Sequence, residues 1–298
     1  MVLTDEKVKE LELQANHIRE SIIEMLLSAG SGHTAGPLGM ADIFTALYFH
    51  ILNHRPHDPF WKDRDRLILS NGHICPVLYA TMAHAGYFSK AELGKLRKFK
   101  SPLQGHPHRE WLPGLETSSG PLGSGLSQAV GMAIADRMDN GRSSGRQFIC
   151  LTGDGELDCG QVWEAAMLAG REKVQNLTVV VDRNNIQIDG YTEDIMPLEP
   201  LADKWRAFGF HVQTIDGHDF KDIINAFGEA RATFEKPSVI IAKTIPGKGI
   251  GFVERRYEWH GIPPDATDVK GAPPKGKQGE EMLKILRTLD GRIKNEHD

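Results

Sequence analysis

A strand–helix–strand unit between Leu151 and Gly190 constrains the fold more than any other part of the sequence. An apolar run that ends in Gly153-Asp154-Gly155 is typical of a strand, Gln161 to Arg171 of a helix, and the apolar run before Asn184-Asn185 of a second strand. Two strands joined through a helix lie parallel. Their carboxyl ends therefore meet at one edge of a sheet, where Asp154 comes close to the asparagine pair.

The residue types at this edge indicate a particular ligand. Carboxylate and carboxamide oxygens from Asp154 and Asn184-Asn185 are the donors that a hard cation such as Mg2+ prefers. The glycines on both sides of Asp154 allow a phosphate group to approach the backbone closely. The sequence therefore predicts a metal–diphosphate site at the carboxyl edge of the sheet.

Helical and strand patterns alternate along most of the chain. Helices are predicted over Asp5–Ala29, over Met40–Leu52 and after Ser89, which is placed to cap the helix that follows it. Further strands are predicted before Asn71 and on both sides of a helical segment, 219–234. This alternation predicts an α/β fold with a mainly parallel sheet and helices on both of its faces.

Composition and charge exclude several classes of partner. Of 298 residues, 40% are hydrophobic and 25% charged, and the formal net charge of −5 argues against nucleic acid or an anionic membrane. Cys75, Cys150 and Cys159 show neither metal-ligand spacing nor a disulfide framework, which suits a reducing compartment. No signal core or apolar run of ~20 residues is found. We therefore expect a cytoplasmic protein with no nucleic acid or membrane partner.

Several histidines stand on predicted turns, where sheets of this kind bind ligands. His33, His73, His106 and His260 each lie beside a glycine. The long loop Lys100–Gly125 ends in a glycine-rich turn before a helix, which favours a polar or anionic ligand, although a tight packing turn gives the same pattern. No G-x-G-x-x-G motif follows the first predicted strand, which argues against a dinucleotide site. The P-loop motif G-x-x-x-x-G-K-[ST] is absent from the sequence, and no G-x-S-x-G motif joins a predicted strand to a helix, as a serine hydrolase requires.

Taken together, these features resemble transketolase. Gly-Asp-Gly, 28 further residues and Asn-Asn are similar to the thiamine diphosphate-binding motif. Additional blocks in the family's order, from about Leu11 to Gly261, narrow the resemblance to transketolase: SGHTAGPLGMADI, SNGH, QGHPH, GLETSSGPLGSGLSQAVGMAIA and KTIPGKGIG…WHG. The resemblance implies the thiamine diphosphate-binding fold and transfer of a two-carbon ketol unit from a ketose phosphate, such as xylulose 5-phosphate, to an aldose phosphate, such as ribose 5-phosphate.

The resemblance also implies cofactors and a role for individual residues. Thiamine diphosphate would bind with Mg2+, for which Ca2+ or Mn2+ could substitute. The metal ligands would be the side chains of Asp154 and Asn184 and the backbone carbonyl of Ile186. The other cofactor contacts would be His73, Gly120, Pro121, Leu122, Gly153, Gly155 and His260. His33, His106 and His260 would surround the reacting sugar carbons, where an imidazole can accept and donate a proton near neutral pH.

Transketolases need a second, pyrimidine-binding domain, and this sequence shows no equivalent of it. We expect one cofactor-binding domain over 4–264, followed by a linker and a C-terminal helix within 265–298. The pyrimidine-binding and C-terminal domains of the family are expected on a separately encoded partner subunit. The resemblance thus implies the N-terminal subunit of a split enzyme, in an α2β2 heterotetramer that is silent without its partner.

Some positions depart from the family pattern. Thr34-Ala35-Gly36 replaces a common Pro-Gly-Ala, with little expected effect. His108 stands where an acidic residue is common, which would alter the substrate mouth, although a structural role is the simpler interpretation for His108 and for His218. Cys159 stands where the family usually has a glutamate of the dimer interface, so communication between active sites is in question. A buried structural cysteine is the alternative interpretation of Cys159.

Two other functions stay open at this point. One keeps the fold and cofactor but changes the acceptor, as in a transketolase for another sugar or a reaction like that of deoxyxylulose phosphate synthase. The other is a non-catalytic scaffold homologue. The complete set of Asp154, Asn184 and the four loop histidines argues against a scaffold, because a scaffold has no physical need for them.

Overall fold

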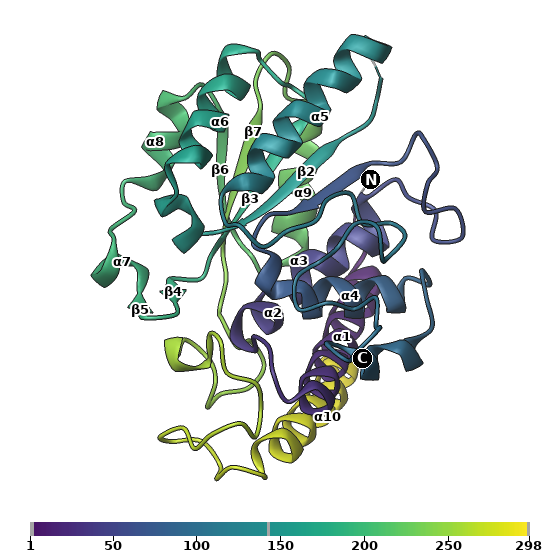
Figure 1. Ribbon diagram of the computed structural model, residues 1–298, viewed down its shortest axis with the longest axis vertical. Coiled ribbons are helices and arrows are strands. Elements are labelled where there is room, and N and C mark those ends of the chain that lie inside the picture. The colour runs from purple at the N-terminus through teal and green to yellow at the C-terminus, as the bar shows by residue number, and fades with distance from the viewer. Residues whose placement is uncertain (1–2, 142–143, 297–298) are drawn as a thin grey trace.

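A five-stranded parallel sheet lies at the centre of the fold, in a computed structural model that describes residues 3–141 and 144–296 (Figure 1). Its strand order is β1-β2-β3-β7-β6, and every neighbouring pair runs parallel. The strands are β1 (Arg66–Leu69), β2 (Phe148–Gly153), β3 (Leu177–Arg183), β6 (His211–Asp216) and β7 (Ser238–Lys243). The predicted α/β fold and the predicted parallel pairing of β2 with β3 are confirmed.

Helices cover both faces because alternate strand residues are apolar on both sides. Ile149 and Leu151 of β2 face one hydrophobic core, and Phe148 and Cys150 face the other. The first core is formed with α1 (Asp5–Ala29), α2 (Ala35–Gly39), α3 (Ala41–Ala46), α4 (Cys75–His84) and α9 (Phe220–Ala232). The second is formed with α5 (Ser124–Asn140), α6 (Gly160–Arg171) and α8 (Leu201–Ala207).

Two helix predictions are corrected by the structure. The segment predicted as one helix over Met40–Leu52 is α3 followed by a π-helical turn, η1 (Leu47–Ile51). Helical structure begins earlier than predicted, with α2 at Ala35, and Pro37 is tolerated in the first turn of α2 because no N–H is needed there. The helix predicted after Ser89 is a 3-10 helix, η3 (Lys90–Lys95), although Ser89 does cap it and accepts the N–H of Ala91 at 3.3 Å.

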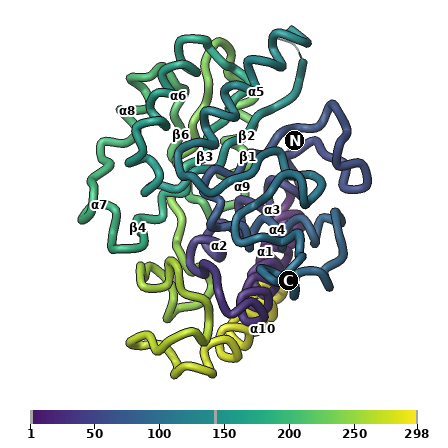
Figure 2. Tube along the Cα trace, viewed as in Figure 1, coloured from purple at the N-terminus to yellow at the C-terminus, as the bar shows by residue number. Residues whose placement is uncertain are grey.

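Shorter elements lie near the carboxyl edge of the sheet. They are the 3-10 helices η2 (Gly72–Ile74), η4 (Gly155–Asp158) and η5 (Tyr257–Trp259), the hairpin of β4 (Ile186–Gln187) and β5 (Gly190–Tyr191), and α7 (Thr192–Ile195). The chain between β7 and α10 (Gln278–Glu296) runs mostly as loops, seen in yellow-green beyond that edge (Figure 2). These loops and turns, and not the long helices, surround the site described below.

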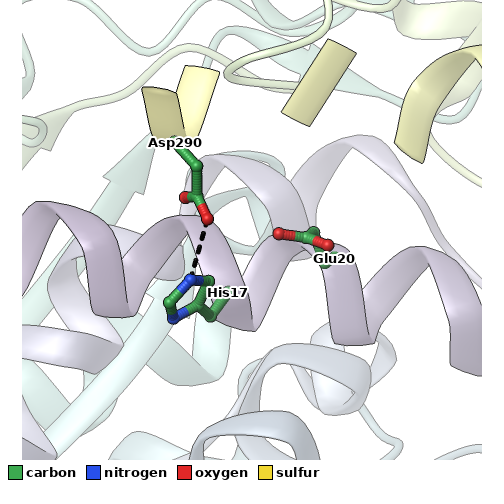
Figure 3. Close-up of side chains that lie close together, drawn as sticks. All are labelled: His17, Glu20 and Asp290. Carbon is green, nitrogen blue, oxygen red and sulfur yellow. Dashed lines mark hydrogen bonds and ion pairs between the residues drawn. The ribbon is translucent and has the colours of Figure 1, made fainter. Parts of the chain in front are cut away.

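The C-terminal helix α10 lies side by side with α1 (Figures 1 and 2). Buried Asn16 on α1 donates its amide to the carbonyl of Leu286 at 2.8 Å and to Asp290 at 2.7 Å. Asp290 also reaches His17 at 2.9 Å, with Glu20 nearby (Figure 3). Neither of these helices, nor any other in the part of the chain that the structure describes, is long and apolar enough to cross a membrane.

Candidate active site

Loops that follow neighbouring strands, together with the segments after α1 and before α5, enclose a cavity of about 270 Å3 at the carboxyl edge of the sheet. The residues predicted from the sequence that line it are His33, His73, His106, Gly120, Leu122, Gly153, Asp154, Gly155, Asn184, Ile186 and His260. Pro121 is the exception, since it is exposed and does not line the cavity although both of its neighbours do. Asn71, Glu156, Asp182, Gln187 and Ile188 also line it and were not predicted as site residues.

Asp154 places a carboxylate at the floor of this cavity, directly after β2. One of its oxygens accepts the N–H of Gly155 at 2.8 Å, and the other accepts the N–H of Asn185 at 2.7 Å. Burial raises the pKa of Asp154 to about 6, and these N–H groups together with Arg183 oppose that rise. A buried anion of this kind is stabilised further by a cation, so Asp154 is suited to bind a metal ion.

Arg183, the last residue of β3, was not singled out from the sequence. Its guanidinium is buried and donates to Asp154 at 3.1 Å and to the hydroxyl of Thr192 at 2.8 Å. It also pairs with Glu193 and, at 3.2 Å, with Glu199. Arg183 therefore ties the carboxylate in the cavity to the segment that follows the β4–β5 hairpin.

Asn184 is held in one orientation by a second carboxylate. Its amide nitrogen donates to Asp182 at 2.8 Å, and its carbonyl oxygen accepts the N–H of Ile186 at 3.0 Å, which leaves that oxygen able to accept one more partner. Asp182 also accepts the hydroxyl of Thr244 from the end of β7. Burial raises the pKa of Asp182 to about 7, an effect that nearby Asp154 reinforces.

Glu156 joins the glycine-rich turn to the sheet. Its carboxylate accepts the N–H of Gly153 at 3.0 Å, the N–H of Gly123 and the hydroxyl of Ser70. The same hydroxyl oxygen accepts the N–H of Gly125 at 3.0 Å. A side chain at Gly125 would collide with Ser70, so the glycine is needed for the close approach of this turn to the end of β1.

Cys159 lies beside that turn, immediately before α6. Its side chain is partly exposed, so the interpretation as a buried structural cysteine is wrong. Burial, Glu156 and Asp158 raise the pKa of its thiol, and the thiol is therefore uncharged near neutral pH. Cys159 therefore presents a neutral group at the edge of the turn.

Three histidines from distant loops form a cluster over the cavity. The ring centroids of His33, His73 and His260 lie 4.8, 5.2 and 5.5 Å apart. Burial lowers the pKa of all three, and the pKa of His33 falls to about 4 with contributions from His260, Arg97 and His106. Burial and Arg97 also lower the pKa of His106. These imidazoles are therefore neutral at physiological pH, and each has one N–H to donate and one nitrogen to accept.

Several buried polar atoms around the cavity have no partner among the described residues. They are Nδ1 of His33 and of His260, both amide atoms of Asn71, and Nε2 of Gln187. Buried polar atoms nearly always have partners in folded proteins, so this arrangement points to a bound ligand. Carboxylate and amide oxygens at one end suit a divalent cation, and donors at the other end suit an oxyanion. A metal–diphosphate fits both ends.

Sequence comparison identifies similar proteins. Residues 11–285 match the family described as transketolase, thiamine diphosphate binding domain. The 6-deoxy-6-sulfo-D-fructose transketolase subunit SqwG of Clostridium sp. (strain MSTE9) is 44% identical over 85% of this chain and 91% of its own length. An apulose-4-phosphate transketolase subunit of Phocaeicola vulgatus is 40% identical over 86% of this chain and 90% of its own length.

Larger transketolases match over only part of their length. Human transketolase is 39% identical over 87% of this chain but 40% of its own length. The crystal structure of transketolase from Campylobacter jejuni superimposes with a TM-score of 0.81 and 34% identity, over 96% of this chain and 48% of that one. The chain therefore spans about nine tenths of the subunits named above and less than half of these two transketolases.

The low pKa of His33 predicts how acid affects stability. The unfolded chain takes up a proton at this histidine near pH 6.5, whereas the folded chain does so only near pH 4. Folding stability is therefore lost as the pH falls from about 6.5 to 4, by on the order of 2–3 kcal/mol for this group. Urea unfolding of wild type and His33→Asn across this range should show the wild type losing that amount relative to the variant. If the unfolding free energies of wild type and variant changed in parallel with pH, the low pKa assigned to His33 would be wrong.

Proposed function

The chain belongs to the transketolase family, whose thiamine diphosphate-binding domain it matches over residues 11–285, and we propose that it is the N-terminal subunit of a two-subunit transketolase. The observation that carries the proposal is the cavity in which Asp154 and Asn184 lie with the neutral histidines. Two relatives named as transketolase subunits match this chain over about nine tenths of their own length. Their names support a separate partner subunit for this chain as well. We further propose an α2β2 complex, and a cytoplasmic location that the three free cysteines support.

Cofactor binding in this proposal uses both ends of the cavity. Asp154, Asn184 and the backbone carbonyl of Ile186 hold Mg2+, or Ca2+ or Mn2+ in its place. Gly153, Gly155, His73 and His260 contact the diphosphate, and the turn formed by Gly120, Pro121 and Leu122 receives the aminopyrimidine. The amide of Asn71 and the amide nitrogen of Gln187, which have no partner among the described residues, add donors. When bound, thiamine diphosphate supplies the nucleophilic carbon and the electron sink for cleavage of a ketose.

The histidines act on the sugar in this proposal. A neutral imidazole can take the proton from a sugar hydroxyl or donate its N–H to a carbonyl oxygen, as cleavage next to a carbonyl requires. The low pKa values of His33 and His260 keep both groups neutral before substrate binds. His106 is the most exposed of the four and also lines a second cavity, so it lies toward the substrate entrance.

The substrates in this proposal are a ketose donor and an aldose acceptor, each with an anionic end. Xylulose 5-phosphate and ribose 5-phosphate are the first pair to test. The relatives named for 6-deoxy-6-sulfo-D-fructose and apulose 4-phosphate support testing those ketoses as alternative donors. A deoxyxylulose phosphate synthase-like reaction and a non-catalytic scaffold are the other outcomes that the experiment below separates.

Purification of the chain from its native cells, followed by mass spectrometry and assay, tests the function. We expect a co-purifying subunit with a pyrimidine-binding domain, and ketol transfer between sugar phosphates by the complex with thiamine diphosphate and Mg2+. The separated chain should be inactive. Activity of the chain alone would contradict the split, and an inactive complex with every ketose named above would contradict the function.

Asp154→Ala tests the metal site. Loss of the buried carboxylate removes a charged metal ligand, so Mg2+-dependent retention of thiamine diphosphate by the complex should be abolished in equilibrium dialysis. Asp189→Asn is the matched control, because Asp189 is an exposed carboxylate on the nearby hairpin that does not line the cavity. Retention that is unchanged in Asp154→Ala would overturn the metal assignment.

His106→Ala tests the assignment of proton transfer. Turnover by the complex should slow by roughly 10²–10⁴-fold, the range for a lost acid–base group, while the dissociation constant of thiamine diphosphate stays within about threefold. Steady-state kinetics and fluorescence titration of the cofactor measure the two quantities. Normal turnover would show that His106 has no catalytic role.

A further inference from the structure

The glycine-rich turn, residues 119–125, forms part of the wall of the cavity through Gly120 and Leu122. The chain before it, 100–118, consists of turns and irregular backbone, and α5 begins within the turn at Ser124. On its outer side, the amide of Gln161 from α6 donates to the carbonyl of Leu122 at 2.8 Å. The position of the turn therefore depends on contacts with segments that are distant in the sequence.

Glu156 makes the buried part of these contacts. Its Oε1 accepts the N–H of Gly123 at 2.5 Å and the hydroxyl of Ser70, and its Oε2 accepts the N–H of Gly153 at 3.0 Å. Ser70 directly follows β1, and Gly153 is the last residue of β2. One carboxylate thus connects the turn to the ends of two neighbouring strands. Both of its oxygens face donors of the protein, so Glu156 acts on the turn and does not itself need to contact a ligand.

Ser70 gives Glu156 a second connection to the turn. The hydroxyl of Ser70 donates to Glu156, which directs the lone pairs of the same oxygen toward the N–H of Gly125, accepted at 3.0 Å. Glu156 therefore holds Gly123 directly and Gly125 through Ser70. These two residues flank the first residue of α5, so the clamp acts where the turn passes into that helix.

The charge of Glu156 is explained by this arrangement. The side chain is 2% exposed, and its partners are two N–H groups and one hydroxyl, with no cation paired to it in the part of the chain that the structure describes. A buried charge is costly, and glutamine would fill the same volume without one. Glutamine, however, accepts on one side of its amide and donates on the other. It would direct an N–H at one of the three donors, whereas a carboxylate accepts on both sides.

The metal end of the cavity is held independently of Glu156. Gly153 pairs with Asp182 in the parallel register of β2 and β3, and the N–H of Asp154 donates to the carbonyl of Asp182 at 3.2 Å. The carboxylate of Asp154 is fixed by Gly155, Asn185 and Arg183. Loss of Glu156 should therefore displace the turn and leave the metal end in place.

We propose that Glu156, acting through Gly123 and Ser70, is a positioning residue that sets the separation between the metal end of the cavity and the glycine-rich turn. It thereby determines how tightly the pyrimidine end of thiamine diphosphate is held, while the diphosphate end is bound without its help. This inference rests on the proposed function, which assigns the turn to the aminopyrimidine. It gives this chain a share in holding the pyrimidine, in addition to the share of its partner subunit.

Binding of two ligands to the reconstituted complex tests the proposal. Thiamine diphosphate with Mg2+ uses both ends of the cavity, whereas inorganic pyrophosphate with Mg2+ uses only the metal end. Equilibrium dialysis gives the dissociation constant of the first, and displacement of the first gives that of the second. Glu156→Gln should raise the dissociation constant of thiamine diphosphate by about 10- to 100-fold, the range for one charge-assisted hydrogen bond, and leave that of pyrophosphate within about threefold. A variant that only loosened the fold would weaken both.

Two further variants sharpen the test. Ser70→Ala removes the second connection, so it should also weaken thiamine diphosphate selectively. In the double variant the two effects should combine to less than their product, because both act on one hydrogen-bonded clamp. Glu280→Gln is the control, because Glu280 is an exposed glutamate of α10 that does not line the cavity.

The outcomes separate the proposal from the function on which it rests. A selective loss of thiamine diphosphate in Glu156→Gln and Ser70→Ala supports the clamp. An intact complex in which the ratio of the two dissociation constants stays at the wild-type value overturns the role of Glu156 alone. If Glu156→Gln does not fold, the same ratio in Ser70→Ala decides between these outcomes. A wild-type complex that retains no thiamine diphosphate with Mg2+ overturns the proposed function as well.

Discussion

The buried carboxylate of Asp154 is the constraint on which the rest of the site depends. A carboxylate removed from water is unstable unless it is paired or hydrogen-bonded, and this one has two N–H donors and one guanidinium among the described residues. Its pKa of about 6 shows that these partners do not fully offset burial. A divalent cation would supply the missing stabilisation. The fold therefore holds a buried charge that such a cation would stabilise, and Arg183 pairs with this charge.

The loop that carries His260 begins at a series of buried polar groups, one of which, Asp182, lines the cavity. Thr244 at the end of β7 donates to Asp182, and the next N–H, that of Ile245, donates to Nε2 of His218 at 2.7 Å. His218 in turn contacts Asp42 of α3 at 2.7 Å. Burial alone would raise the pKa of Asp42, but Arg19 and His218 lower it to about 2. The loop is thus fixed to α1 and α3 through His218 and the buried pair of Asp42 and Arg19, which agrees with the structural role predicted for His218.

Local rules were sufficient to predict the parts of the site that follow strands. The strand–helix–strand pattern placed Asp154 and Asn184 at one edge, and glycine-bounded turns singled out His33, His73, His106 and His260, all of which line one cavity. Arg183 and Asp182 could not be predicted in this way, because their partners come from other segments: Glu199 beyond the hairpin, and Thr244 at the end of another strand. The same reason applies to the packing of α10 on α1, which depends on Asn16 reaching Leu286. A pattern along the chain does not contain such pairings.

The character of the lining changes within the cavity. Carboxylates gather at the ends of β2 and β3, whereas the histidines over the same cavity have pKa values lowered by burial. A carboxylate close to an imidazole would favour its charged form and raise its pKa, but the groups that act on His33 are other imidazoles and the guanidinium of Arg97. This arrangement keeps the histidines neutral, so that each has one nitrogen to accept a proton and one N–H to donate.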